Sequence, residues 1–248
     1  MVLGLSGTDL FGVGMLAVGI VVLLASARYV WRASAVSRAA AVSTLDRVDP
    51  RSLVRISGTA ESGDADTLTA PFSGRDSLVL RYAVEERRLS PYLLPWFVTV
   101  HERAGSVPFR LRTPAAVVDV IEPARTVTLE TDRVAAVGVG EAPPARIGRF
   151  EHHTDALPST TIWHARPFGL GAIMGALSLG ARRYTEARAL PGDDVTVVGR
   201  VTDAGGVDPL VVSDRSPTAT LRRMAGTSLI GLAIGAFAAV LGAVMLAG

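Results

Sequence analysis

The sequence predicts a mostly β fold of the α+β class: an antiparallel barrel-like or sandwich-like domain with one inserted apolar helix, flanked by two transmembrane helices. Two uncharged apolar runs, residues 10–27 and 224–248, predict the membrane helices, because about 20 predominantly apolar residues are enough to cross a bilayer. Between the runs, short segments of alternating apolar and polar residues are separated by turn residues, and that pattern is typical of an antiparallel β domain.

The first membrane helix is expected over residues 10–31, after a short tail formed by residues 1–9. The second is expected over residues 222–248. Arginine flanks each apolar run on its inner side, and aromatic residues accompany the first cluster, as is common where helices leave a bilayer. The side chains expected to anchor the helices in the lipid bilayer are Arg28, Tyr29, Trp31, Arg32, Arg222 and Arg223.

The arginine clusters also predict an orientation. Both lie next to the middle region, and basic residues concentrate on the cytoplasmic side of membrane proteins. We therefore expect a multi-pass protein of the cell membrane, with a cytoplasmic middle domain and external termini. A cleaved signal peptide is the alternative, because residues 25–27 (Ala-Ser-Ala) resemble a cleavage site, although no basic residue precedes the apolar run.

Small residues are spaced along the second apolar run, where Gly231 and Gly235 are followed by Ala239 and Gly242. Faces of small residues let helices approach closely in lipid. We therefore expect the two membrane helices to touch. The same glycine faces would also allow a homo-oligomer.

Residues 32–50 are expected to form a juxtamembrane helix or linker. The helix should continue to Leu45 and end before Asp49-Pro50, since the residue before a proline disfavours helix. The β-rich domain then occupies residues 51–220. Its expected strands are residues 52–60, 77–86, 96–103, 107–113, 116–121, 126–137, 194–202 and 209–212, and the turns between them include residues 73–74, 104–105, 122–123 and 203–206.

One apolar segment interrupts these strands. Residues 168–181, FGLGAIMGALSLGA, carry no charge. The segment is too short to span a bilayer comfortably and fits a buried or interfacial helix. Its glycines do not follow the order of a dinucleotide-binding loop, and no phosphate-binding GK[ST] sequence follows them.

Composition narrows the chemistry that the chain can perform. There is no cysteine, which excludes disulfides, thiolate nucleophiles and cysteine-ligated zinc. The net charge is only +2, and the arginines beside the apolar runs account for that excess, so we expect no nucleic-acid partner. We also expect no metal and no cofactor.

The histidines are the remaining candidates for catalysis. His152 and His153 are expected in an exposed polar loop, because adjacent side chains on a strand point apart and no i, i+4 pair is present. His101 lies alone in an expected strand and is interpreted as a surface residue. Residues 85–88 (Glu-Glu-Arg-Arg) are interpreted as a solvated strand end that carries cross-strand ion pairs.

Several segments, in order along the chain, resemble the sequence blocks of the GIDE domain, a module also called BAM, for beside a membrane. They are APFSGR at 70–75, LRYAVEER at 80–87, PFRL at 108–111 with VVD at 117–119, RRYTEARALPGDDVTVVG at 182–199, and PLVVS at 209–213. The GIDE domain occurs in membrane-anchored RING ubiquitin ligases of mitochondria and in many bacterial and archaeal membrane proteins. The resemblance covers residues 52–221 and extends to the helix–domain–helix layout.

This resemblance implies a domain held beside a membrane, with its motif residues as candidates for contacting a ligand. Those candidates are Pro71, Ser73, Gly74, Arg81, Tyr82 and Glu85. The same motifs also suit fold roles, with residues 71–74 and 191–192 as turns and Gly199 allowing the close approach of a neighbouring backbone.

The resemblance does not carry ligase activity over to this chain. The ligases add a RING that binds zinc through cysteine and histidine, and a chain without cysteine cannot form it. In the mitochondrial ligases the domain faces the intermembrane space, whereas the arginines of this chain favour the cytoplasm.

The expected function is therefore that of a membrane-anchored, non-enzymatic module that binds a protein, a lipid or a small ligand at the membrane surface. Two alternatives remain open. One is a scaffold of a ubiquitin-ligase-like system without its own RING. The other is a membrane-associated hydrolase that uses His101, or His152 and His153.

Overall fold

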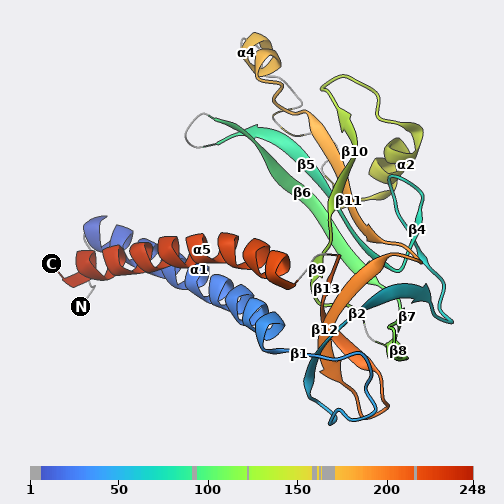
Figure 1. The fold of residues 1–248 in the computed structure, drawn as a ribbon. Coiled ribbons are helices and arrows are strands. Elements are labelled where there is room, and N and C mark those ends of the chain that lie inside the picture. The colour runs from blue at the N-terminus through green and yellow to red at the C-terminus, as the bar shows by residue number, and fades with distance from the viewer. Residues whose placement is uncertain are drawn as a thin grey trace. The chain divides into compact units, whose positions relative to one another are not determined.

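The computed structural model describes residues 7–90, 94–121, 123–157, 161, 163, 171–214 and 217–247, and for residues 29–37, 173 and 217–230 it describes the backbone alone. The chain divides into two compact units. One, the helical pair, is formed by the two ends of the chain. The other, the β domain, is formed by Ala41–Asp214. Figure 1 shows both units, which we describe separately.

The helical pair consists of α1 (Gly7–Arg38) and α5 (Pro217–Ala247). Contacts between the helices run in opposite directions along the two sequences: a Cβ atom on Gly19 would lie 2.8 Å from the carbonyl oxygen of Gly235, and one on Gly242 would lie 2.7 Å from that of Gly12. The helices are therefore antiparallel, with the two chain ends at the same end of the pair (Figure 1). The expectation that these helices touch is confirmed.

One helix contains a segment long and apolar enough to cross a membrane, namely Gly7–Arg28 of α1. The corresponding segment of α5 whose side chains are described is Gly231–Ala247, which is shorter. The helix begins at Gly7, so the expected tail of residues 1–9 already contains its first turn, and residues 1–6 lie outside the described part.

The helix expected to continue to Leu45 ends earlier, at Arg38. Ala40–Ala41 forms strand β1, and the N–H group of Val42 donates to the carbonyl oxygen of Arg55 at 3.0 Å. Val42 and Leu45 then pack against the core of the β domain. Burial of these apolar side chains, together with the hydrogen bonds to the sheet, outweighs the helical propensity of this alanine-rich segment.

The larger sheet of the β domain is built from seven strands in the order β1-β2-β12-β13-β8-β7, with β9 beside β13. Strand β7 also pairs with β2, so the hydrogen-bonded path returns on itself through five strands. Strand β12 pairs antiparallel with β2 and β13, and β7 pairs antiparallel with β2 and β8. Strand β13 is parallel to its neighbours β8 and β9. The strands are β2 (Leu53–Ser62), β7 (Phe109–Arg112), β8 (Val117–Val120), β9 (Val127–Thr128), β12 (Asp194–Val201) and β13 (Val207–Ser213).

Two glycines let strands of this sheet approach closely. A Cβ atom on Gly58 would lie 2.3 Å from the carbonyl oxygen of Arg112, and one on Gly199 would lie 2.3 Å from that of Asp208. No side chain fits at either position. The interpretation of Gly199 as a position of close backbone approach is confirmed. The inward side chains of the sheet form the main core, which includes Val54, Ile56, Phe109, Leu111, Val120, Val197 and Val212.

A second sheet of four antiparallel strands has the order β10-β11-β5-β6. Its strands are β5 (Val79–Leu89), β6 (Pro95–Ser106), β10 (Thr131–Val137) and β11 (Arg182–Ala189), and the short pair β3 (Leu68–Thr69) and β4 (Asp76–Ser77) lies apart from it. Strand β11 was not among the strands expected from the sequence. The turn expected at residues 104–105 lies inside β6, and the strand expected over 126–137 is divided into β9 and β10.

Two short helices accompany the second sheet, α2 (Ala145–His153) and α4 (Gly171–Ala176). The expectation of a loop around His152 and His153 is thus wrong, because these residues lie in the last turn of α2. Within α2, Ile147 is buried in a small core with Val84 of β5 and Tyr184 of β11, which packs the helix on the sheet. Of the apolar helix expected over 168–181, the described part is helical only over α4, and residues 168–170 lie outside it.

Candidate functional site

The most unusual feature of the β domain is a pair of fully buried glutamates on neighbouring strands. Glu86 on β5 and Glu186 on β11 have no exposed surface. In the register of these strands Glu86 lies opposite Arg182, and Tyr82 lies opposite Glu186. An ionised carboxylate in a protein interior costs several kcal/mol unless it is paired, so the partners of these two residues organise the inner face of the sheet.

Glu186 holds the turn that connects β3 to β4. Its Oε1 accepts hydrogen bonds from the backbone N–H groups of Phe72 and Ser73, at 2.7 and 3.1 Å. Arg188 donates from Nη1 to Oε2 of Glu186 at 3.0 Å and to Oγ of Ser73 at 2.6 Å. One carboxylate therefore satisfies two backbone donors and one cation, which is the condition for burying it without a large penalty.

The other side of this turn contacts α2. Arg146 donates from Nε to the carbonyl oxygen of Pro71 at 3.2 Å. Gly74 has a φ of 77°, and a Cβ atom there would lie 2.7 Å from Nη1 of Arg146. Pro71, Ser73 and Gly74, which the resemblance made candidates for contacting a ligand, thus lie in a tight turn between β3 and β4. The interpretation of residues 71–74 as a turn is confirmed.

An aromatic cluster surrounds this turn on the inner face of the sheet. Phe72 meets Tyr82, Phe150 and Tyr184 edge-to-face, with ring centroids 5.7, 5.1 and 5.3 Å apart. Such geometry is favoured between aromatic rings. Burial raises the pKa of Tyr82, although the charge of Arg103 opposes it.

His101 belongs to this cluster, so its interpretation as a surface residue is wrong. It is 9% exposed, and its ring lies between Tyr82 and Phe150, with centroids 5.9 and 5.8 Å away. The reason is a β-bulge in β6: the register shifts at this point, so that His101 faces inward opposite Val84. Its Nε2 is buried and has no hydrogen-bond partner among the described residues, and burial, helped by the charge of Arg103, lowers its pKa.

Arg81 and Glu85 lie on the opposite face of β5 from Tyr82, because successive side chains on a strand alternate. Arg81 forms an ion pair with Glu102 at 2.7 Å, and Glu85 forms one with Arg183. The structure therefore divides the six candidate residues between two faces. Cross-strand ion pairs were expected at residues 85–88, but the expectation that this strand end is solvated is wrong for Glu86.

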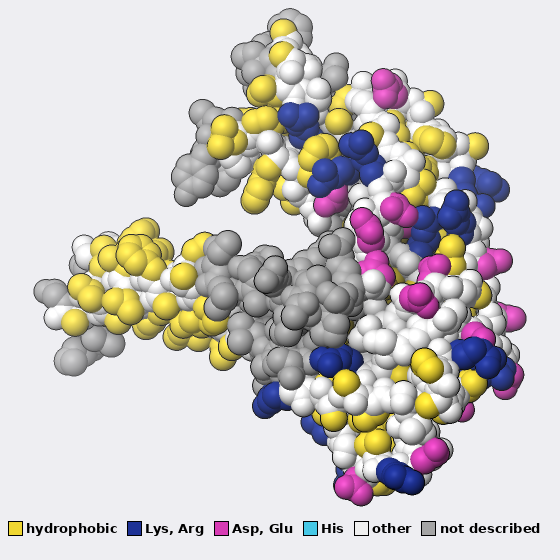
Figure 2. Space-filling model, in the orientation of Figure 1, with side chains coloured by type: hydrophobic (Ala, Val, Ile, Leu, Met, Phe, Trp, Pro, Cys, Tyr) yellow, Lys and Arg dark blue, Asp and Glu magenta, His cyan; other side chains and the backbone are white. Residues whose placement is uncertain are grey.

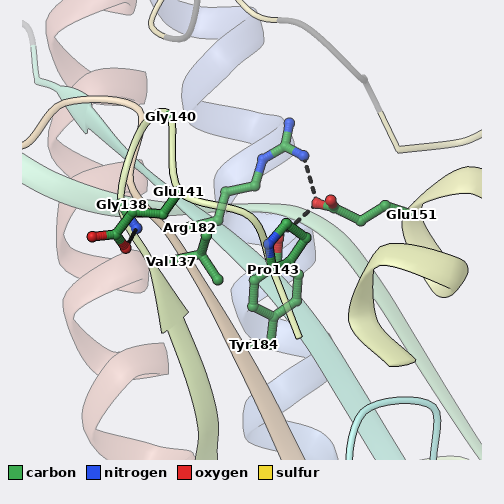
Figure 3. A pocket seen from close by; sticks show the side chains of 8 residues that line it. All are labelled: Val137, Gly138, Gly140, Glu141, Pro143, Glu151, Arg182 and Tyr184. Carbon is green, nitrogen blue, oxygen red and sulfur yellow. Dashed lines mark hydrogen bonds and ion pairs between the residues drawn. The ribbon is translucent and has the colours of Figure 1, made fainter. Parts of the chain in front are cut away.

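A small pocket of about 200 Å³ opens at one edge of the inner face. Figure 3 shows that Arg182 and Tyr184 both point toward Glu151 of α2. Nη1 of Arg182 donates to Oε1 of Glu151 at 2.8 Å, and the Tyr184 hydroxyl donates to the same oxygen at 2.6 Å. Burial, followed by the hydrogen bond to Glu151, raises the pKa of Tyr184.

The network continues inward from this pocket to Glu86. Arg182 lies 3.4 Å from Oε2 of Glu86, while Nε of Arg88 and the hydroxyl of Thr161 donate to Oε1 at 2.9 and 3.0 Å. Ligand pockets usually enclose about 300–1,000 Å³, so this one is small. Because its arginine and tyrosine already bind Glu151, an entering ligand would have to displace an internal partner. The arrangement is that of a structural network which fastens α2 to the sheet.

His152 and His153 do not join this network. His152 and His153 are exposed on α2, and Nδ1 of His153 is hydrogen-bonded to the carbonyl oxygen of Arg149 at 2.7 Å. Across the described residues, no group of three or more metal-ligating side chains is close enough to hold an ion. Of the expected anchoring residues, Arg28 is exposed on α1, and the side chains of Tyr29, Trp31, Arg32, Arg222 and Arg223 lie outside the described part.

Sequence reasoning did not identify the partly buried pairs Arg182–Glu151 and Arg188–Glu186. One signal was present: Arg182, Tyr184, Glu186 and Arg188 alternate along one strand, but a stripe of charges normally indicates a solvent-facing surface. Comparison with protein-family models, with curated proteins and with solved structures found no match for this chain.

Proposed function

We propose that this protein is a membrane-anchored, non-enzymatic module, in which α1 and α5 cross the bilayer as an antiparallel pair and hold the β domain at the membrane surface. There the domain would bind a protein, a lipid or a small ligand. One observation carries the proposal. Glycines lie where the two helices contact each other, and exposed apolar side chains cover the outer surface of the pair.

The outer surface of the pair is unsuited to water. Val21 and Leu24 of α1 are 66% and 68% exposed, and Phe237 of α5 is 70% exposed. Removing one such side chain from water is worth about 1.5–3 kcal/mol. The other large apolar side chains exposed on the two helices are Leu10, Phe11, Val13, Val18, Ile20, Ile234, Val240, Leu241, Val244 and Leu246. Acyl chains would cover all of them at once.

The packing between the two helices is of the kind that holds helices together within lipid. A Cβ atom on Gly19 would lie 2.5 Å from the backbone nitrogen of Ala239, and one on Gly231 would lie 2.4 Å from Oγ of Ser26. In a bilayer the hydrophobic effect does not drive helices together, and interfaces of small residues that allow close backbone packing take its place. The seam supports a pair of helices that associates within lipid.

The β domain itself is proposed to be a GIDE-like domain. The closed path of five paired strands supports a small barrel. The resemblance gains support from the contact between two of its blocks, because Glu186 of the RRYTEAR block binds the turn of the APFSGR block. Arginines at the inner ends of both apolar runs support a cytoplasmic domain.

Extraction of membranes tests the anchoring. Membranes from cells expressing the full chain are washed with alkaline carbonate, which removes peripheral proteins. We expect the chain to remain in the pellet and to dissolve only in detergent. A chain released by carbonate would contradict the proposal. Chemical sequencing of the N-terminus, run in parallel, distinguishes a retained α1 from a cleaved signal peptide, which would begin at Arg28.

A further inference from the structure

The end of the β5–β6 hairpin exposes large apolar side chains. Leu94 and Trp96 at the start of β6 are 66% and 54% exposed. Residues 89–98 of the sequence, LSPYLLPWFV, contain no charge. We call Arg87, Leu94, Trp96 and Phe97 the hairpin end. Large exposed apolar side chains that lie close together mark surfaces that contact something else.

Apolar side chains lie on both faces of this hairpin end. Trp96 lies opposite Arg88 and Phe97 lies opposite Arg87 in the register of β5 and β6. Because consecutive residues of a strand point to opposite faces, Trp96 and Phe97 project in opposite directions. A protein partner would cover one face, whereas lipid surrounds a strand end on every side.

Two arginine side chains lie against the Phe97 ring of the hairpin end. The guanidinium of Arg183 lies over the Phe97 ring, 4.0 Å from its centroid, and that of Arg87 is 5.9 Å from the same ring. Arg183 is paired with Glu85. Within the described part of the chain Arg87 has no carboxylate partner, so its charge is available to a phosphate. Aromatic rings backed by arginine are typical of the headgroup level of a membrane.

The two strands of the hairpin end are hydrogen-bonded to each other. The pairing of β5 with β6 extends to Leu89 and Pro95, the N–H group of Ser90 donates to the carbonyl oxygen of Leu94 at 2.9 Å, and that of Leu94 donates to Oγ of Ser90 at 3.1 Å. Internal hydrogen bonding reduces the cost of placing a backbone in lipid. Strand β6 lies at the edge of its sheet, and an open sheet edge is not tolerated in the hydrocarbon region. We therefore expect the hairpin end to insert only among the headgroups.

A second apolar segment leaves the sheet at the same place. The N–H group of Gly180 donates to the carbonyl oxygen of Arg87 at 2.7 Å, and that of Arg87 donates to the carbonyl oxygen of Ala181 at 2.8 Å. These bonds join the end of β5 to the segment 171–181, which begins with α4 and has no charged residue. Figure 2 shows hydrophobic side chains beside arginines in this region of the β domain.

From these observations we infer that the hairpin end is a lipid-contacting surface, inserted at the headgroup level of a bilayer that contains anionic lipid, with Trp96 and Leu94 in the interface and Arg87 on a lipid phosphate. The inference rests on the proposed membrane anchoring. It adds a contact between the β domain and the bilayer that is separate from the two helices.

Tryptophan fluorescence of the full chain tests the contact. Trp31→Phe and Trp163→Phe leave Trp96 as the single tryptophan, and the protein is reconstituted in vesicles of phosphatidylcholine with phosphatidylglycerol. We expect a blue-shifted emission that is quenched by lipids brominated on the acyl chain and protected from aqueous acrylamide. Vesicles of phosphatidylcholine alone should give weaker quenching. Equal quenching in both would overturn the role of Arg87.

Matched variants identify the surface responsible. Leu94→Glu should reduce the quenching of Trp96 by brominated lipid and increase its quenching by acrylamide. Val117→Glu, at a residue of β8 that is also exposed, should leave both unchanged. If the chain resists carbonate extraction but brominated lipid does not quench Trp96, the inference fails and the anchoring stands. Release of the chain by carbonate overturns both. Protection from acrylamide without quenching by brominated lipid would assign the surface to a protein instead and also overturns the inference.

Discussion

The carboxylate of Glu186 accepts a hydrogen bond from the backbone N–H group of Phe72 at 2.7 Å, across 114 positions of sequence. The same oxygen accepts the N–H group of Ser73. This contact joins the turn between β3 and β4 to the centre of the four-stranded sheet. It also places the Phe72 ring in the aromatic cluster, so the packing of one face of the β domain depends on a buried charge.

Replacing Glu186 should therefore be costly. Glu186→Ala leaves two backbone donors without their acceptor and removes the buried carboxylate partner of Arg188, and breaking a buried pair in this way costs about 3–5 kcal/mol. The free energy of unfolding of the full chain in detergent, from urea titration followed by near-ultraviolet circular dichroism, measures the loss. Glu102→Ala is the control, because its ion pair with Arg81 is exposed and should contribute about 1 kcal/mol or less. Equal losses in the two variants would argue against a central role for Glu186.

His101 should make the β domain less stable in mild acid. Burial lowers its pKa in the folded state, so the unfolded chain, with a histidine pKa of about 6.5, binds more protons than the folded one. Stability therefore rises with pH across the interval between the two pKa values. It is lost as the pH falls below the unfolded value. Urea titrations between neutral pH and pH 5 measure this slope.

The matched variant is His101→Phe, which keeps an aromatic ring between Tyr82 and Phe150 and removes the titrating group. It should flatten the part of the slope near neutral pH. His153→Phe, at an exposed position of α2, should leave that slope as it is in the natural sequence. An unchanged slope in His101→Phe would show that other groups cause the dependence.

The packing of α1 against α5 should be disrupted by a side chain at a glycine between the helices and unaffected by one at a glycine that faces away from the partner helix. Gly19→Leu places a side chain where a Cβ atom would already lie 2.5 Å from the backbone of Ala239, whereas nothing lies within 4 Å of a Cβ atom on Gly14. The chain has no cysteine, so introduced cysteines report only on their own pair. Disulfide formation between Ser26→Cys and Gly231→Cys should be slowed by Gly19→Leu and unaffected by Gly14→Leu. Equal rates in both would contradict the packing.

The orientation of the β domain can be read from an inserted reporter. The turn between β12 and β13 is exposed at Ala204 and Gly205, so it should accept an insertion without disturbing the paired strands on either side. If the domain is cytoplasmic, a reporter that works only in the cytoplasm should be active there. Activity from a reporter that works only outside the cytoplasm, at equal expression, would reverse the orientation.

Local features of the sequence predicted a substantial part of this structure. The apolar composition of residues 10–27 predicted α1, and alternation predicted β2, β5 and most of β6. Turns with glycine or proline were also predictable, because Gly74 and Gly192 adopt positive φ values of 77° and 99° that few other residues accept. Each of these properties depends on neighbouring residues in the chain.

The candidate site was not predictable in the same way. Glu86 and Glu186 occur in stripes of charge that normally face water, and the partners that make their burial favourable include groups 96 and 114 positions away. His101 faces inward because of a bulge in β6, and bulges are set by pairing between strands. Glu186 and Arg188 of the RRYTEAR block belong to a recognisable sequence motif, but the sequence did not predict which residues they contact.

The sequence by itself determined where apolar helices, several of the alternating strands and the glycine turns occur, since these follow from composition and short-range periodicity. Only the tertiary structure decided which charged residues are buried, where α1 gives way to β1, and that the glycines of α1 face those of α5. The physical reason is that burying a charge, ending a helix or bringing two helix backbones close together is favourable only when a distant segment supplies the contacting groups. Which segment supplies them is decided by the tertiary structure.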